Sequence, residues 1–517
     1  MDGGKHILIG VDAGTSVIKS VAFDLEGRQI AAASVPNRYE TRADGAAFQS
    51  LDETWRNCAR SLRDLGDKVA DLTKRVSAVG LTAQGDGTWL VGTENRPVTD
   101  AWLWLDARSA PTVRRLRGQG SDQIRFEKTG TGLTVCQQGS QLAHMLATQP
   151  DLVASAEVAL HCKDWLYLNL TGVRATDPSE ALFTFGNFRT GQYDSTVIEA
   201  LGLAGQRRLL PEIVDGRRVT HPLSSGAAAA TGLVAGTPIS LGYVDFACAA
   251  IGAGLYTDGT PARCTILGST GMHMRAMPVG DVRLNAERTG YTLALPIDGV
   301  VAQLQSNMAA TLNLDWLLSL AADLLAEMGQ AAPRAALLDR IEAWAAAGRP
   351  GALLYHPYIS EAGERGPFVN SHARAGFTGL NLAHRFPDLV RAVIEGLGLA
   401  ARDCYDVMGP SSSEVRLTGG ACRSPALRAI LSAALDAPVR ISSREEAGAA
   451  GAAMMAGVAI GAHADMDAAI ARWVMPMLGA PEQPDPKLAR LYARLYPAYV
   501  AARQALAPTW AALGGEP

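Results

Sequence analysis

The N-terminal sequence ILIGVDAGTSVIKSVAFD carries side chains suited to chemistry with phosphate groups. Gly14 lets the backbone approach an anion closely, and Thr15 and Ser16 add hydroxyl and amide donors. Lys19 adds a positive charge as the second strand leaves the turn. Asp12 would repel a bare phosphate, so its presence favours a Mg²⁺ ion between the two. An ordinary β-hairpin with a glycine turn is the alternative interpretation.

These residues must be positioned by elements that the sequence pattern predicts. Three strands separated by short turns open the chain, and they indicate an antiparallel meander at the start of a mixed sheet. A helix over residues 50–66 begins with Ser50 as its cap and Glu53 three residues later. Residues 76–84 predict a buried strand that ends in polar residues, the usual place of a ligand contact in an α/β sheet.

The same pattern begins again near residue 246. A helix leads into CTILGSTGMHMRAM at 264–277, which predicts another strand, a turn of small residues and a strand. Two further strands are followed by predicted helices at 312–327 and 333–347. Because the second turn occupies the same place in its half as the first, we expect two related domains that face one cleft.

Length and composition limit the class of protein. A chain of 517 residues is too long for one hydrophobic core, so at least two domains are expected. Its 47 Lys and Arg against 51 Asp and Glu argue against nucleic acid or an anionic membrane as the main partner. Seven cysteines without a CxxC pair, and no signal-peptide or membrane-span pattern, predict a cytoplasmic protein with reduced thiols. The oligomeric state stays open, with a homodimer as one candidate.

Several motifs follow one another in a characteristic order. They are KDWLYLNLTGVRATDPSEA at 163–181, GYVDFACAAIGAG at 242–254, GALLYHPYISEAGERGPFVNSHARAGFTG at 351–379, PDLVRAVIEGLGLAARD at 387–403 and VRLTGGACRSPALRAILSAALDAPV at 415–439. In order and spacing they resemble the FGGY family of carbohydrate kinases over nearly the whole chain. The resemblance implies an α/β fold of two actin-like, ribonuclease-H-like ATPase domains around a central cleft. It implies an N-terminal domain over residues 1–245 and a C-terminal domain over residues 246–517, with sugar or polyol deep in the cleft and ATP across it.

Carried onto the matching positions, the resemblance implies a nucleotide site made of three loops. Asp12 is similar to the metal-associated aspartate of the first phosphate loop, and Lys19 stands where the family often has Arg. For Gly419 and Gly420, a helix-entry turn is the alternative interpretation. The residues implied to bind ATP are Gly14, Thr15, Ser16 and Lys19 in the first phosphate loop, Gly268, Ser269 and Thr270 in the second, and Gly419, Gly420, Ala421 and Ser424 around the adenosine.

Asp245 follows an apolar strand and precedes a helix, so the residues alone favour a helix N-cap. A cap position does not exclude catalysis. Phosphoryl transfer needs a group that aligns the hydroxyl and accepts its proton late, and a carboxylate at the floor of a cleft suits that role. With the resemblance added, Asp245 is expected to contact the substrate and to act as the general base.

The resemblance places the sugar pocket in LTAQGDGTWLV and DAWLWLDARSA. Gln84 and Asp86 can bond hydroxyls, and Trp104 offers a flat apolar wall, with core packing as its alternative role. Asp106 and Arg108 could supply an acceptor and donors to the substrate. An internal ion pair that fixes the loop is the alternative for these two residues.

The QGDG sequence at 84–87 departs from the Met-His of xylulose kinases and the Arg-Glu of glycerol kinases. It is most similar to the family members that phosphorylate erythritol, and somewhat similar to those that act on L-xylulose. We therefore expect an ATP-dependent kinase that phosphorylates a terminal hydroxyl of erythritol, because Gln, Asp and Trp recognise hydroxyls alone. L-Xylulose or another pentulose is the alternative substrate. A non-catalytic sugar-responsive protein is the alternative of another class, but it would be expected to lose the base or the phosphate loops.

Overall fold

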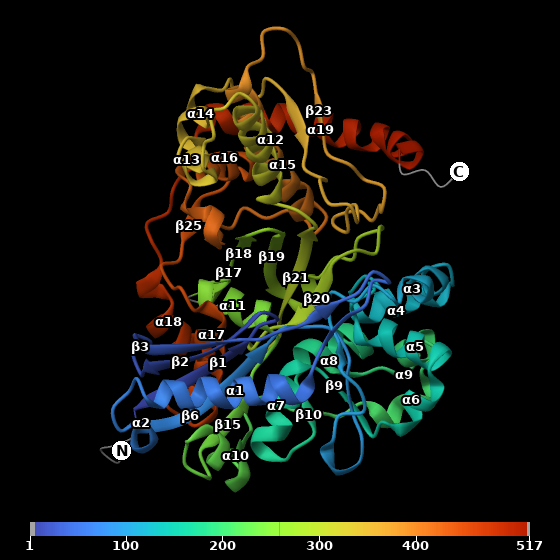
Figure 1. Ribbon diagram of the computed structural model, residues 1–517, viewed down its shortest axis with the longest axis vertical. Helices are drawn as coiled ribbons and strands as arrows, with labels where there is room; N and C mark the ends of the chain where they lie inside the picture. Colours follow the sequence, from blue (N-terminus) through green and yellow to red (C-terminus); the bar gives the residue numbers. More distant parts are fainter. Residues whose placement is uncertain (1–5, 258, 514–517) are drawn as a thin grey trace.

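Two six-stranded sheets, which share the order of five of their strands and differ in the edge that carries the sixth, form the centres of two domains. A computed structural model describes residues 6–257 and 259–513, and Figure 1 shows one sheet above the other. In the first sheet, three consecutive antiparallel strands are followed by two strands that run parallel to the first of them. In sheet order its strands are β14 (Thr220–Pro222), β15 (Pro238–Leu241), β6 (Val76–Ala83), β1 (Ile7–Ala13), β2 (Val17–Asp24) and β3 (Gln29–Pro36).

The second sheet repeats this arrangement. Its antiparallel strands β18, β19 and β21 correspond to β1, β2 and β3, and its parallel strands β24 and β25 correspond to β6 and β15. In sheet order its strands are β20 (Tyr291–Ala294), β21 (Val300–Asn307), β19 (Gly271–Pro278), β18 (Arg263–Leu267), β24 (Val415–Thr418) and β25 (Val439–Ile441). The predicted pair of related α/β domains is thereby confirmed.

Local signals in the sequence locate several helices correctly. Ser50 caps α1 (Leu51–Gly66), and its hydroxyl oxygen accepts a hydrogen bond from the Glu53 N–H at 3.3 Å. The helix predicted over 312–327 is α12 (Leu312–Glu327). The helix predicted over 333–347 is instead divided into α13 (Arg334–Leu338) and α14 (Ile341–Ala347). The division occurs because the N–H of residue 340 bonds the carbonyl three residues back, which tightens the backbone out of the α-helical pattern.

Two helices lie between the sheets, α11 (Asp245–Ala253) and α17 (Ala447–Ala459) (Figure 1). The second of them comes from the C-terminal part of the chain, yet it packs on β1 and β6 of the first sheet. Glycines make this contact possible. A Cβ atom on Gly10 would lie 1.9 Å from the Ala449 carbonyl oxygen, and one on Gly80 would lie 2.0 Å from that of Ala452. The hydrophobic core between the sheets therefore contains side chains from both halves of the chain.

Helices also cover the outer faces of the sheets. On the first sheet these are α1 and α7 (Cys162–Thr171), and on the second α15 (Phe386–Asp406). A helical layer with its own core follows β6 in sequence and lies beside the first sheet (Figure 1). The remaining long helices are α3 (Ala110–Arg117), α4 (Ser121–Thr129), α5 (Gln138–Thr148), α8 (Pro178–Phe185), α16 (Pro425–Leu435), α18 (Met466–Trp473) and α19 (Pro486–Leu513).

Two further expectations concern the whole chain. All seven cysteines are buried and unpaired, as predicted for reduced thiols. Within residues 6–257 and 259–513, none of the helices combines the length and the apolar character needed to cross a membrane.

Replacing Gly10 by Ala tests the contact between α17 and the first sheet. The added methyl group would overlap the Ala449 carbonyl oxygen, so strand and helix must separate, and we expect a loss of about 1–3 kcal/mol in the free energy of unfolding. Urea unfolding followed by circular dichroism measures this loss. The matched control is Gly226→Ala in α10 (Ser225–Thr231), where the added methyl group meets no atom within 4 Å and helix propensity favours Ala. Wild-type stability in Gly10→Ala would contradict the close packing.

Candidate active site

A cavity of about 180 Å³ lies between the two domains and is lined by residues of both. Thr15, Asp86, Trp104 and Asp245 line it from the first half of the chain, and Thr270 lines it from the second. The predicted base, two predicted substrate contacts and one residue of each predicted phosphate loop thus surround one space. The other lining residues are Gly85, Cys136, Phe246, Met272, Tyr291, Leu304, Ser306 and Arg365.

The direction of the strands explains why these residues meet. β1, β6 and β15 run parallel, so the turns that follow them share one edge of the first sheet. Asp12 lies near the end of β1, Asp86 follows β6, and Asp245 follows β15. In the second sheet, β18 and β24 are parallel neighbours, so the turns at 268–270 and 419–421 also share an edge. Ligands of α/β sheets bind at such edges.

Asp245 is the first residue of α11, and Val244 occupies the cap position that the sequence pattern suggested for Asp245. Its Oδ1 atom accepts a hydrogen bond from the Phe246 N–H at 2.7 Å. Burial raises the pKa of Asp245 well above its usual range, the Asp12 carboxylate adds to this rise, and the Phe246 N–H opposes it. A carboxylate with a raised pKa is a stronger base than a solvated one.

Asp86 is held in a turn with a positive φ of 57°. Its Oδ2 atom accepts hydrogen bonds from the Tyr291 hydroxyl at 3.0 Å and from the Cys136 thiol at 3.2 Å. Its N–H donates to Glu180 Oε1 at 2.8 Å. Burial raises the pKa of Asp86, and the hydrogen bonds from Cys136 and Tyr291 oppose this rise. Two hydrogen bonds to Oδ2 and one from the backbone N–H therefore hold Asp86 in place, and Oδ1 has no hydrogen-bond partner among the described residues.

The amino end of α8 braces two turns of the site at once. Glu180 accepts from the Asp86 N–H, and the neighbouring Ser179 hydroxyl oxygen accepts from the Val244 N–H at 3.0 Å. Because Val244 immediately precedes Asp245, one helix end positions the backbone at both carboxylates that line the cavity.

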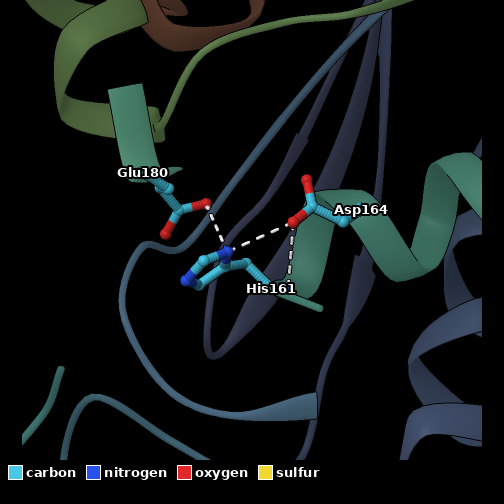
Figure 2. Close-up of side chains that lie close together, drawn as sticks. All are labelled: His161, Asp164 and Glu180. Atoms are coloured by element: carbon cyan, nitrogen blue, oxygen red, sulfur yellow. Dashed lines mark hydrogen bonds and ion pairs between the residues drawn. The ribbon is translucent and has the colours of Figure 1, made fainter. Parts of the chain in front are cut away.

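His161, Asp164 and Glu180 have the residue types of a metal site, and their ligand atoms lie within 4.8 Å of one another (Figure 2). The ammonium group of Lys163 lies among them, 3.1 Å from Asp164 Oδ1 and 2.6 Å from Asp177 Oδ2, and it also contacts Glu180. Burial raises the pKa of Glu180 to about 7, against the lowering effect of His161 and Lys163. A buried cation already balances these carboxylates, so the cluster is an ion network that supports α8.

Two carboxylates, those of Asp12 and Glu446, lie at the first predicted phosphate loop. Burial raises the pKa of Asp12 to about 6, Lys19 lowers it, and Glu446 raises it further. Lys19 Nζ pairs with Glu446 at 2.9 Å, so its charge is shared with this carboxylate. Ser16 is exposed to solvent beside the turn. Among the predicted ATP-binding side chains of this loop, only Thr15 lines the cavity.

Gln84 and Trp104 both bind the Thr15 side chain. The Thr15 hydroxyl donates to Gln84 Oε1 at 2.7 Å and accepts from the Trp104 indole N–H at 2.9 Å. Gln84 also donates to Gln49 Oε1 at 2.8 Å, and it does not line the cavity. Gln84 therefore orients the Thr15 hydroxyl without lining the cavity itself, whereas Trp104 lines the cavity.

Asp106 and Arg108 form the internal ion pair that was the alternative interpretation. Arg108 Nη2 lies 2.6 Å from Asp106 Oδ2, and the same oxygen accepts from the Ala47 N–H at 2.9 Å. The guanidinium group lies over the Trp102 ring, 3.5 Å from its centroid. Asp106 is fully buried, and neither residue lines the cavity. The pair fixes the loop because both carboxylate oxygens are already occupied.

The segment predicted as the second phosphate loop and the segment predicted as the adenosine platform lie next to each other. Gly419 has a φ of 97°, and a Cβ atom there would lie 2.3 Å from the Leu267 carbonyl oxygen, so only glycine fits. Gly268 carries no such restriction and is open to a ligand. Ser424 is the N-cap of α16 and donates to Glu342, so its hydroxyl is already engaged. Gly420 is exposed and Ala421 half-buried, with no charged group of their own.

Comparison with known proteins gives the family. Residues 7–252 match the N-terminal domain of the FGGY family of carbohydrate kinases, and residues 264–460 match its C-terminal domain. The chain belongs to this family. The FGGY kinase is 63% identical over 504 residues to an erythritol kinase of Brucella abortus (strain 2308), which covers 98% of this chain and 97% of the relative. It is therefore a carbohydrate kinase, a phosphotransferase that uses ATP.

More distant relatives are also sugar kinases. The FGGY kinase is 25% identical over 465 residues to the L-xylulose/3-keto-L-gulonate kinase of Escherichia coli (strain K12), over 88% of each chain. The crystal structure of xylulose kinase from Rhodospirillum rubrum is similar with a TM-score of 0.86 and 26% identity, and it covers 98% of this chain and 99% of the other.

Two residues of the cavity were not predicted from the sequence. Tyr291 opens β20, and only the sheet order, which places this edge strand near the first domain, brings it to Asp86. Arg365 belongs to GERGP at 363–367, where a charged pair between glycines was a usable signal for a site residue. Its neighbour Glu364 anchors the loop, because it accepts hydrogen bonds from the Met308 and Arg365 N–H groups, both at 2.9 Å.

Replacing Glu364 by Gln tests the electrostatics of this loop. Burial raises the pKa of Glu364 from 4.5 to about 7, so the folded state binds this proton more tightly than the unfolded state. That contribution to stability is complete below the unfolded pKa and is lost as the pH rises through the folded one. We therefore expect the wild type to lose up to about 3 kcal/mol relative to Glu364→Gln as the pH rises across this range. Urea unfolding of both proteins at several pH values measures it, and a constant difference would contradict the buried carboxyl.

Proposed function

We propose that this FGGY kinase transfers the γ-phosphoryl group of ATP to a terminal hydroxyl of erythritol and gives erythritol phosphate. The 63% identity over 98% of the chain to the Brucella abortus erythritol kinase supports this substrate. The observation that carries the proposal is the cavity itself, where Asp245 and Asp86 from one domain meet Thr270 from the other. A proton acceptor, a hydroxyl-binding carboxylate and a phosphate loop are then available to one small molecule.

Asp245 takes the role of general base in this proposal. Its place at the amino end of α11 holds one oxygen on the Phe246 N–H, so the other is free to accept the proton of the attacking hydroxyl. Burial among other carboxylates raises the pKa of Asp245, which favours proton uptake as the new O–P bond forms. The carboxylate also orients the hydroxyl toward the phosphate, and orientation supplies most of the catalysis in phosphoryl transfer.

Asp12 would hold Mg²⁺, because its carboxylate offers the hard oxygen ligand that this ion prefers. The neighbouring backbone leaves room, since a Cβ atom on Gly448 would lie 2.4 Å from Asp12 Oδ2. When bound, the ion neutralises charge on the transferring phosphates. The residues proposed to hold ATP are Gly14, Thr15, Ser16, Lys19, Gly268, Ser269 and Thr270 at the phosphates, and Gly419, Gly420, Ala421 and Ser424 at the adenosine.

The cavity suits a short polyol. Its walls include the apolar side chains of Trp104, Phe246, Met272 and Leu304, which can cover a carbon backbone, and a few polar groups among them. A pentulose such as L-xylulose is the second candidate, and the 25% identity to the Escherichia coli L-xylulose/3-keto-L-gulonate kinase supports it more weakly. The seven unpaired cysteines support a cytoplasmic enzyme.

Replacing Asp245 by Asn removes the proton acceptor while Oδ1 can still accept from Phe246. We expect kcat to fall about 10²–10⁴-fold, with little change in KM for erythritol, because the hydroxyl is bound but no longer deprotonated. Steady-state ADP release measures both constants. Asp339→Asn, at an exposed position, is the control and should keep wild-type rates. Normal kcat in Asp245→Asn would remove Asp245 from the role of base.

A substrate panel tests the acceptor. We expect erythritol to give the highest kcat/KM with Mg²⁺-ATP among erythritol, threitol, glycerol, xylitol, L-xylulose, D-xylulose and L-ribulose, because the site recognises hydroxyls. ADP release measures the initial rates. A ketose that exceeds erythritol by more than about tenfold, or about 1.4 kcal/mol in transition-state stabilisation, would make erythritol the wrong assignment.

A further inference from the structure

Two residues that line the cavity each carry a buried polar atom without a hydrogen-bond partner among the described residues. These atoms are Asp86 Oδ1, from the first domain, and Arg365 Nε, from the second. Both residues line the cavity, and Asp86 is only 8% exposed. A buried acceptor or donor without a partner is costly, and native proteins pair nearly all such groups with protein, water or ligand. A ligand that pairs both atoms at once would remove both costs.

The two residues are fixed before any ligand binds. Tyr291 and Cys136 hold the other carboxylate oxygen of Asp86, which leaves Oδ1 as the free atom. Glu364 holds the backbone at Arg365. Burial raises the pKa of Asp86, and the positive charge of Arg365 on the other side of the cavity is among the groups that oppose this rise.

A carboxylate oxygen and a guanidinium N–H that both lack a partner, on two residues that line one cavity, are complementary to a hydroxyl group. The hydroxyl hydrogen is donated to Asp86 Oδ1, and the hydroxyl oxygen accepts from Arg365 Nε. A carbonyl oxygen can accept from the arginine but has no hydrogen to donate, so it would leave the carboxylate unpaired. A site built in this way rejects the group that lacks the required donor.

We propose that Asp86 and Arg365 together bind the hydroxyl at the end of the polyol remote from the phosphorylated one, and that they discriminate against a carbonyl there. This inference rests on the proposed function, because it assigns the far end of the same substrate. Arg365 is then a specificity-determining residue. The polyol joins the two domains, since Asp86 belongs to one and Arg365 to the other.

The contact between Arg365 and the remote hydroxyl is tested by removing the guanidinium group from the enzyme and the hydroxyl from the substrate, separately and together. The substrates are erythritol and erythro-butane-1,2,3-triol, which lacks one terminal hydroxyl. The wild type is expected to lose about 10- to 100-fold in kcat/KM with the triol, the range for a hydrogen bond to a charged group. Arg365→Gln is expected to lose a similar factor with erythritol and to distinguish the two substrates far less than the wild type does. Arg340→Gln, at an exposed position on the second domain, is the control and should keep the wild-type ratio.

A second variant tests the other partner. In Asp86→Asn, the hydrogen bonds from Tyr291 and Cys136 keep the amide oxygen at the Oδ2 position, so the amide N–H₂ replaces Oδ1 and can donate to a carbonyl. With transfer to the C5 hydroxyl of L-xylulose, its C2 carbonyl lies three bonds from the phosphorylated carbon, as the carbon of the remote hydroxyl does in erythritol. The ratio of kcat/KM for L-xylulose over erythritol is therefore expected to rise about tenfold or more in Asp86→Asn. Urea unfolding confirms that each variant is folded.

The outcomes separate this inference from the proposed function. If Arg365→Gln lowers kcat/KM equally for erythritol and the triol, or if Asp86→Asn leaves the ketose ratio unchanged, the pair does not read the remote hydroxyl and the inference is overturned. In either case the wild type would still phosphorylate erythritol. If the wild type does not phosphorylate erythritol but acts on a ketose, the proposed function fails first, and the inference fails with it.

Discussion

The burial of carboxylates is the constraint around which this site is built. Burial raises the pKa of Asp245, and the carboxylates of Asp12, Glu180 and Asp86 add to this rise. Charges in a protein interior interact far more strongly than in water. The fold compensates with backbone N–H groups at helix starts and with the buried Lys163 cation behind α8. Of these four carboxylates, Asp86 and Asp245 line the cavity, where a hydroxyl of the proposed substrate would bind.

The two domains are not independent bodies joined by a linker. α17 lies on β1 and β6 with backbone against backbone, because Gly10 and Gly80 carry no side chain. α11, which begins at Asp245, packs against α17 in the same core. The element that carries the proposed base is therefore supported by the C-terminal part of the chain, and the chemistry of one domain depends on the packing of the other.

Sequence reasoning succeeded where the signal was local. The Ser50 cap, the end of β6 and the turns after β1 and β18 could be read from neighbouring residues, and Thr15, Asp86 and Thr270 of these turns and of the segment after β6 line the cavity. It was less successful where a partner lies far along the chain. Lys19 stays predicted to bind phosphate, but no local pattern indicated that its ammonium group pairs with Glu446, which lies 427 residues away. Asp106 has the residue type of a hydroxyl acceptor, but only the fold shows that its oxygens are taken by its own loop.

For the same reason, the sequence did not predict the position of Tyr291 or the packing of α17, because their contacts are with residues far away in the chain. No local periodicity indicates that a helix near residue 450 covers strands that begin at residue 7. That feature also determines the order in which the molecule can assemble on the ribosome. The first sheet is synthesised early, but one of its faces stays bare until residue 459 has emerged, long after its own strands are complete. We therefore expect nascent chains of this kinase to expose an uncovered apolar surface through most of translation, and C-terminal truncation to destabilise the N-terminal domain as well.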